Sequence, residues 1–387
     1  MYKKSTISLL ATLAIGLNVA LSSVAWAKDP NMAVQTKDRN GDGKVSFDEW
    51  DKPEFVFNKI DFNGDGYLTA QEFAKKWGIP MSGGGSNARS VADAGSLDDT
   101  SVIIADVHMH PHPNNHPIDQ LTWMNRNGVK WAGLGEMLGG RSVRENYRQT
   151  LGNRYIPFGG QSALNQIFFK YGVSGLEDEN NPMFRDLMTE LKQDFDSGKL
   201  KGIGEVFGDN SNGNPKSKIK RKTNVYAPTY KGMIDLVAKY GGALSIHVDW
   251  NRDSIAHLES LADYNTDGNI IWAHCGGNTH ANDVRKVLQR HGNIYCDLSA
   301  RHKPKLTSRI VKKKPHQEIF TSYSLNSGWK DLIEEMPDRF MVGTDTKGGA
   351  KYDKGISNIR NGLLANLSQE TAEKVAYKNA QRLLNLH

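Results

Sequence analysis

After residue 100 the chain alternates short apolar runs with stretches of helical periodicity, and this alternation restricts the fold more than any other feature. The apolar runs predict eight strands, near residues 102–107, 129–135, 154–160, 201–206, 242–248, 269–274, 293–298 and 339–344. Helices are predicted near 183–196, 228–240, 252–263, 280–291, 328–336 and 369–386. Strands that alternate with helices pair in parallel, and eight such units suit a closed (β/α)₈ barrel. An open, doubly wound sheet is the alternative, but no GxGxxG motif follows the first strand.

Histidines and carboxylates stand at the carboxyl ends of several of these predicted strands. The residues are His108, His110, Glu205, His247, His274 and Asp345. In a barrel of this kind the catalytic groups project from the strand ends. Alternate residues of a strand point the same way, so His108 and His110 can both face one ion. Neutral imidazoles with carboxylates suit Zn²⁺ or a similar divalent metal.

This order of residues, with the local sequences WAHCGG and VGTDT, closely resembles the amidohydrolase superfamily, and in particular its amidohydrolase-2 branch. The resemblance covers essentially all of residues 101–387. It implies metal binding by His108, His110, His247 and Asp345. It also implies that His274 binds a second ion or orients the attacking water, and that Glu205 bridges two ions. Glu205 is equally explained as a hydrogen-bond acceptor behind the ligands, so one or two ions remain open.

The expected reaction follows from the predicted metal cluster. A divalent ion lowers the pKa of a bound water and polarises the oxygen under attack. Asp345 can take the proton and pass it to the leaving group, with His274 as the second catalytic residue. We therefore expect a metal-dependent hydrolase acting on a C–N, ester or lactone bond. The alternatives are an amidohydrolase-2-type decarboxylase, for which one metal suffices, and a calcium-dependent binding protein with a vestigial barrel.

Two acidic segments, 38–49 and 61–72, each match the twelve-residue calcium loop of an EF-hand. Both carry oxygen-bearing side chains at loop positions one, three and five, glycine at six and glutamate at twelve. Position seven offers its backbone carbonyl, and Ser46 can act through water. The predicted Ca²⁺ ligands are Asp38, Asn40, Asp42, Lys44 and Glu49 in the first loop, and Asp61, Asn63, Asp65, Tyr67 and Glu72 in the second.

The two calcium loops lie too close together for full EF-hand helices, and Pro53 stands between them. We expect shortened helices, and a short strand contact between Val45 and Leu68. Calcium would act as a structural clamp, with an affinity on the order of 10⁻⁴ to 10⁻³ M. Loops that have lost calcium binding are the alternative.

The first 27 residues have the pattern of a secretory signal peptide. Lys3 and Lys4 precede an apolar run over 7–24, and Ala-Trp-Ala at 25–27 is a small-x-small cleavage site. An uncleaved anchor is the alternative, although the run is short for a membrane span and no second span follows. We expect a periplasmic or secreted protein. Its predicted parts are a signal peptide over 1–27, an EF-hand pair over 28–78, a flexible Gly- and Ser-rich linker over 79–100, and the barrel over 101–387.

The formal net charge is +6, and much of the positive charge falls in two runs. One run spans 216–222, after the fourth strand, and the other spans 301–305 and 312–314, after the seventh. On the active-site face these runs could steer an anionic small-molecule substrate. Solvated loop charge is the alternative. Aromatic residues are not interleaved with the basic ones, so nucleic acid is not an expected partner.

Cys275 and Cys296 are the only cysteines. A single possible bridge cannot provide a disulfide framework for a chain of this length. We expect the two residues to pack as small apolar side chains on neighbouring buried strands. The sequence does not indicate an oligomeric state.

Overall fold

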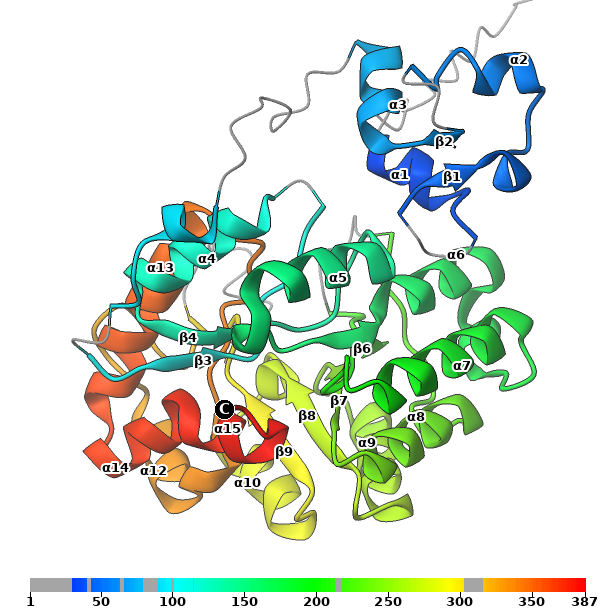
Figure 1. The fold of residues 1–387 in the computed structure, drawn as a ribbon. Coiled ribbons are helices and arrows are strands. Elements are labelled where there is room, and N and C mark those ends of the chain that lie inside the picture. The colour runs from blue at the N-terminus through cyan, green and yellow to red at the C-terminus, as the bar shows by residue number, and fades with distance from the viewer. Residues whose placement is uncertain are drawn as a thin grey trace, which may run out of the picture.

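The structure is a computed structural model that describes residues 30–39, 43–62, 66–78, 90–98, 101–113, 115–212, 218–302 and 316–387. The predicted signal peptide over 1–27 lies outside the described residues. So do four predicted calcium ligands, Asn40, Asp42, Asn63 and Asp65. Figure 1 shows a small N-terminal unit in blue and a larger unit that runs from cyan to red.

Eight parallel strands form the centre of the larger unit and close into a barrel (Figure 1). In chain order they are β3 (Ile104–Asp106), β4 (Val129–Ala132), β5 (Phe158–Gly160), β6 (Gly202–Asp209), β7 (Ala243–Val248), β8 (Asn269–Ala273), β9 (Ile294–Asp297) and β10 (Phe340–Met341). Neighbours in the chain pair from β5 to β10, and β3 pairs with β4. A bridge of Ala132 with Tyr155 joins β4 to β5, and one of Met109 with Thr346 joins β3 to β10. The predicted barrel is confirmed, and each predicted strand overlaps an observed one.

Helices cover the outside of the barrel. They are α4 (Pro117–Arg126), α5 (Gly140–Leu151), α6 (Gln161–Glu177), α7 (Pro182–Asp196), α8 (Pro228–Lys239), α9 (Arg252–Tyr264), α10 (Ala281–Arg290), α12 (Ser327–Glu335) and α13 (Ala350–Asn358). Five of the predicted helices correspond to α7, α8, α9, α10 and α12. The predicted helix over 369–386 consists of α14 (Gln369–Glu373), a π-helical turn (Lys374–Lys378) and α15 (Asn379–Leu384). The sequence did not predict α4, α5, α6 or α13.

Shorter helical turns connect some of these elements. A 3₁₀ turn (His274–Gly276) directly follows β8, and another (Pro337–Arg339) directly precedes β10. The remaining turns are Gly152–Arg154 after α5, the π-helical Ile359–Leu363 after α13, and Leu364–Asn366. The turn after β8 carries one of the predicted metal ligands.

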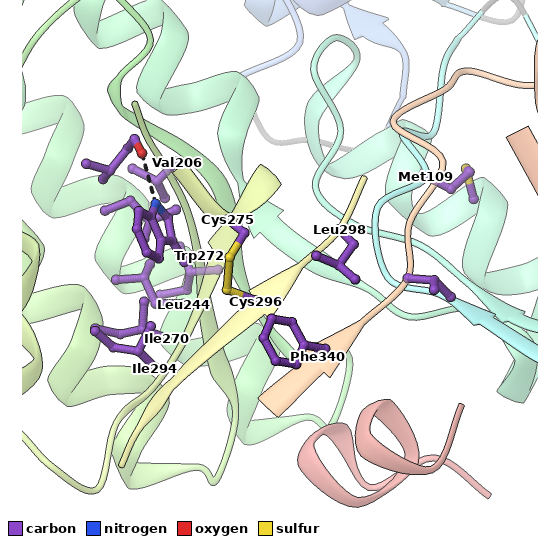
Figure 2. Close-up of a cluster of buried hydrophobic side chains, with 14 of the residues drawn as sticks. Met109, Val206, Leu244, Ile270, Trp272, Cys275, Ile294, Cys296, Leu298 and Phe340 are labelled. Atoms are coloured by element: carbon purple, nitrogen blue, oxygen red, sulfur yellow. Dashed lines mark hydrogen bonds between the residues drawn. A yellow bond between two sulfur atoms is a disulfide. The ribbon is translucent and has the colours of Figure 1, made fainter. Parts of the chain in front are cut away.

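A cluster of buried apolar side chains packs around strands β8 and β9, and Figure 2 shows the pair Cys275–Cys296 within it. The two cysteines form a disulfide with their Cα atoms 4.9 Å apart. The expectation that they pack as separate side chains is therefore wrong. Cys275 lies beyond the end of β8, in a turn with a positive φ of 48°, and this turn brings it within bonding reach of β9.

Replacing both cysteines by alanine is expected to lower the free energy of unfolding by about 3 kcal/mol, because a bridge across 21 residues restricts the unfolded chain. Urea unfolding of the purified protein, followed by tryptophan fluorescence, measures this difference. An unchanged urea midpoint in the double variant would contradict the bridge.

The N-terminal unit has the shortened helices that the loop spacing predicts. Its elements are α1 (Pro30–Gln35), β1 (Val45–Ser46), a 3₁₀ turn (Phe47–Glu49), α2 (Glu54–Phe57), β2 (Tyr67–Leu68) and α3 (Ala70–Trp77). β1 and β2 pair antiparallel with Val45 opposite Leu68, as predicted. Both side chains are fully buried in a separate apolar cluster that includes Phe57 and Phe73. The pairing fixes the two loops back to back.

The end of the predicted linker contacts the barrel. Residues 91–94 form a 3₁₀ turn, and the Asn125 side-chain amide donates to the carbonyl oxygens of Ala94 and Gly95 at 2.9 and 2.6 Å. Ala94 is buried in the main core. This part of the segment is therefore attached to α4, unlike the free linker that its composition predicts. Among the described residues, no helix is long and apolar enough to cross a membrane.

Candidate metal centre

The predicted ligands meet at the carboxyl ends of the barrel strands. His108, His110 and Glu205 are almost fully buried, and His274 is 8% exposed. His274 and Asp345 have left-handed backbone conformations, with φ of 57° and 50°. Such conformations are uncommon outside glycine and often mark functional sites. Two overlapping groups have ligand atoms within 4.8 Å of one another: His108, Glu205 and His274, and His108, His110 and Asp345.

Glu205 is central to this cluster because its two carboxylate oxygens face different pairs of histidines. Oε2 lies 3.6 Å from His108 Nε2 and 3.7 Å from His110 Nε2. Oε1 lies 3.3 Å from His274 Nε2 and 3.0 Å from His247 Nδ1. Burial favours the neutral acid, but His108 and the hydrogen bonds from the surrounding imidazoles hold the pKa of Glu205 well below its usual range. The carboxylate is therefore ionised.

The spacing and bonding of this cluster fit a divalent ion. Two atoms bound to one ion at roughly 2.0–2.2 Å lie roughly 3.3–3.6 Å apart in tetrahedral geometry. Asp345 Oδ1 lies 3.5 Å from His110 Nε2 and 3.8 Å from His108 Nε2, close to that spacing. His108 Nε2 is buried and has no hydrogen-bond partner. A buried polar atom without a partner is unfavourable unless something binds it, and an ion between these side chains would do so.

Asp297 and Ser299, which the sequence analysis missed, hold two of the histidines from behind. The Asp297 carboxylate contacts His108 Nδ1, and the Ser299 hydroxyl donates to Asp297 Oδ2 at 2.9 Å. The same hydroxyl lies 2.9 Å from Nδ1 of His274. Contacts at Nδ1 turn Nε2 toward the centre of the cluster. Both residues stand at the carboxyl end of a predicted strand, so the rule that found the ligands also applies to them.

Asp106 joins the first and last strands beneath the metal centre. Its Oδ1 accepts the backbone N–H of His108 at 3.1 Å and that of Thr344 at 2.9 Å. Its Oδ2 accepts the Thr344 hydroxyl at 2.8 Å. Burial raises the pKa of Asp106 to about 6, although these hydrogen bonds oppose the increase. Asp106 thus fixes the His-x-His segment against the loop that carries Asp345.

His247 differs from the other predicted ligands because both of its ring nitrogens have carboxylate partners. Nδ1 contacts Glu205, and Nε2 lies 3.2 Å from Asp249 Oδ1. It belongs to neither of the two tight ligand groups. The structure therefore brings His247 to the centre beside Glu205, and its coordination of an ion stays a prediction.

Asp297→Asn is expected to lower metal affinity about 10- to 100-fold, because an amide fixes the His108 ring less strongly than a carboxylate does. Competition with a fluorescent chelator measures the affinity. Asp263→Asn is the matched control, since Asp263 contacts His291 Nδ1 at 3.0 Å through a similar pair remote from the cluster. Equal metal affinities of the two variants would contradict this role of Asp297.

The described parts of the calcium loops are arranged alike. In the first loop Glu49 accepts the backbone N–H of Arg39 at 2.8 Å and that of Ser46 at 2.9 Å. In the second, Glu72 accepts the N–H of Phe62 at 3.0 Å and that of Thr69 at 2.9 Å. Each glutamate thus closes its own loop from position twelve. Of the remaining predicted ligands, the described ones are Asp38, Lys44, Asp61 and Tyr67.

The arginines of the two basic runs are buried rather than solvated. Arg221 donates to the Phe207 carbonyl oxygen at 2.9 Å and to the Asn165 side chain at 3.1 Å. Arg301 is fully buried. The described lysines of the first run are exposed or partly exposed, and Lys222 lies 3.6 Å from Asp253. Solvated loop charge therefore fits the described lysines of the first run but not these two arginines, and the lysines of the second run lie outside the described residues.

Solved structures that are similar to this one include those of three bacterial proteins. An uncharacterized TIM-barrel protein of Bordetella bronchiseptica is 12% identical, with a TM-score of 0.48 over 73% of this chain and 99% of that one. An amidohydrolase of Burkholderia multivorans is 11% identical, with a TM-score of 0.44 over 74% and 99%. A probable 2-pyrone-4,6-dicarboxylic acid hydrolase of Acinetobacter baumannii is 11% identical, with a TM-score of 0.45 over 73% and 99%. No curated protein sequence matches significantly.

Two protein-family models match the sequence itself. The EF hand model matches residues 38–52 and 54–75, which include both predicted calcium loops. The amidohydrolase model matches residues 190–386, about half of the chain. This region holds Glu205, His247, His274 and Asp345, and the His-x-His pair precedes it at the end of the first barrel strand. The chain is an enzyme that belongs to the amidohydrolase family, with a pair of EF-hands ahead of its barrel.

Proposed function

We propose that this protein is a secreted hydrolase that uses two divalent metal ions, such as Zn²⁺, to cleave a C–N, ester or lactone bond. One observation carries the proposal: the two oxygens of Glu205 face two separate pairs of histidines. A carboxylate in that position is better placed to bridge two ions than to bind a single ion. A decarboxylase that needs one ion is the alternative that this geometry disfavours.

The residues of the centre would have different roles in hydrolysis. Divalent metal in this cluster would lower the pKa of a water and polarise the scissile carbonyl group. Asp345 reaches into the cluster from a side chain that is 36% exposed, so it can face both the ions and an incoming substrate. The imidazoles of His110, His274 and His108 hold the pKa of Asp345 below its usual range, although burial opposes them. Ionised Asp345 accepts the proton of the attacking water and delivers it to the leaving group.

Metal analysis followed by a substrate screen tests the proposal. Elemental analysis of the purified protein is expected to find two transition-metal ions or zinc ions per chain in addition to calcium. The metal-loaded enzyme is then assayed against amides, esters, lactones and aromatic carboxylic acids. Hydrolysis of one of the first three classes is expected. A single ion per chain with release of CO₂ from an aromatic acid would overturn the proposal in favour of decarboxylation.

We further propose that calcium stabilises the EF-hand pair and that the protein acts outside the cytoplasm. The back-to-back pairing of Val45 with Leu68 supports the first point, because it fixes two loops of the EF hand family in register. The signal-peptide pattern over 1–27 and the disulfide Cys275–Cys296 support the second, since structural disulfides persist in oxidising compartments.

Glu72→Gln is expected to reduce calcium binding from two ions to one, because the loop loses its bidentate carboxylate. Isothermal titration calorimetry with Ca²⁺ counts the ions, at affinities on the order of 10⁻⁴ to 10⁻³ M. Glu54→Gln is the control, since Glu54 begins α2 between the two loops and lies outside both. If the Glu54 variant lost one calcium ion, or if the Glu72 variant lost both, the idea that each glutamate closes only its own loop would be wrong.

A further inference from the structure

A polar cavity of about 210 Å³ lies where the first turns of α10 and α12 converge. A Cβ atom at Gly328, in the first turn of α12, would lie 4.0 Å from the Cβ of Ala281, in the first turn of α10. The cavity is also lined by Thr279, His280 and His316. None of these residues is among the predicted metal ligands. The volume is sufficient for a small ion together with water.

The two helices present their positive ends to this cavity. Backbone N–H groups in the first turn of a helix have no partner within the helix, and the helix dipole adds positive potential there. α10 begins without a side-chain cap. In α12 the Asn326 side chain accepts the N–H of Trp329 at 3.3 Å. Among the described residues, none accepts a hydrogen bond from the backbone amides of Ala281, Asn282 and Gly328, so these amides are available to a ligand.

Arg301 places a buried positive charge directly behind the cavity wall. Its guanidinium donates to the carbonyl oxygens of Thr279 at 3.3 Å and His316 at 3.1 Å, and it lies 4.8 Å from the Trp329 ring. A guanidinium is charged at neutral pH, so this buried group carries a full positive charge. No described carboxylate forms an ion pair with it, although a buried cation is stable only when its charge is balanced.

The side chains that line the cavity are mostly polar and uncharged. The rings of His280 and His316 lie 3.6 Å apart, and burial together with His280 and Arg301 lowers the pKa of His316. Thr279 is 1% exposed, and its hydroxyl has no hydrogen-bond partner. The Thr279 methyl group faces Gly276, which leaves the hydroxyl directed elsewhere. Glu318 is the one carboxylate among the described residues that line the cavity.

We propose that this cavity binds a small oxyanion, of the phosphate, sulfate or carboxylate type, between the N-termini of α10 and α12. The ligand would accept hydrogen bonds from the free amides of the two first turns and from the Thr279 hydroxyl, and it would balance the charge of Arg301. Arg301 also donates to the carbonyl oxygen of His274 at 3.2 Å, so the same guanidinium contacts the loop that carries a metal ligand. The site is separate from the metal centre and does not depend on which bond the enzyme cleaves.

Calorimetric titration of the metal-loaded, full-length protein with inorganic phosphate tests the site. Asn282→Asp places a negative charge in the exposed first turn of α10. An acidic side chain there stabilises the helix through its dipole, but it repels an anion in the cavity. Phosphate affinity is expected to fall roughly tenfold in this variant. Gln193→Glu adds the same charge at an exposed position of α7 and is expected to leave the affinity unchanged.

Two results would overturn the site: wild-type protein that does not bind phosphate, or an Asn282→Asp variant that binds it as tightly as wild type does. The second result would place the phosphate elsewhere, for example at the metal centre. Thr279→Val provides a second check without added charge and is expected to weaken phosphate binding several-fold. Once a substrate is known, competitive inhibition by phosphate that Asn282→Asp weakens would identify the ligand as an acid group of that substrate, and noncompetitive inhibition would identify it as a free oxyanion.

Discussion

Asp345→Asn is expected to lower the turnover rate by roughly 10²- to 10⁴-fold, because the amide cannot accept the proton of the attacking water. The asparagine has the same shape and keeps an oxygen near His110, so the fold should not change. Turnover is measured on the substrate that the screen identifies, with the enzyme loaded with metal to saturation. The rate constant should fall more strongly than the substrate affinity, since the proton transfer occurs only during the reaction.

Asp353→Asn is the matched control for this substitution. Asp353 lies in α13, shortly after Asp345, and pairs with Arg126 away from the metal centre. Its variant should keep the wild-type rate. The proton-transfer role of Asp345 fails if Asp345→Asn retains more than about a tenth of the activity while its metal content equals that of wild type.

Glu205→Gln is expected to remove one of two metal ions and to lower the rate by roughly 10²-fold or more, because several kcal/mol of charge stabilisation is lost with the ion. The neutral amide can still bind His247 or His274, but it cannot join two cations. Elemental analysis of the variant gives the metal content, and the substrate assay gives the rate.

Glu136→Gln separates this effect from the general cost of changing a buried carboxylate. Glu136 is 2% exposed and pairs with Arg144 at 3.0 Å, so its replacement should lower stability but leave the metal content unchanged. Two ions retained in the Glu205 variant would show that Glu205 is a hydrogen-bond acceptor behind the ligands rather than a bridge.

The barrel and most of the candidate site could be predicted because both follow from short-range rules. Each strand is a compact apolar run, and each predicted ligand stands at the end of such a run. Parallel pairing then brings the strand ends to one face without further information. The antiparallel contact of Val45 with Leu68 was predictable for a similar reason, since loop position eight is apolar in both calcium loops.

Three of the four helices that the sequence did not reveal lack the usual start signals. α5, α6 and α13 begin after glycines, at positions 139, 160 and 349, and none has a side-chain cap. α6 also contains Gly172 with a non-helical conformation, which interrupts its apolar periodicity. The stability of these helices depends on packing against the barrel, and a local sequence pattern carries no information about that packing.

The disulfide and the residues behind the ligands depend on tertiary geometry. Cys275 reaches Cys296 only because the chain turns sharply after His274. Gly276 and Gly277 indicate a turn there, but they do not show which strand the turn brings Cys275 to. Asp297 meets His108 across the barrel from a strand 189 residues further along the chain. The sequence showed that Asp297 stands at a strand end, but it did not show that His108 is its partner.

The predicted metal ligands come from both ends of the barrel sequence, and the hydrogen bonds between Asp106 and Thr344 hold those ends together. The His-x-His pair belongs to the first barrel strand, whereas Asp345 follows the last, so a growing chain lacks a complete ligand set until residue 345 has been made. A polypeptide exported in an unfolded form would therefore load its ions only after the barrel has closed in its destination compartment. For the exported protein that we propose, metal uptake would report that folding is complete, and the metal supply of the destination compartment would decide which ion is bound.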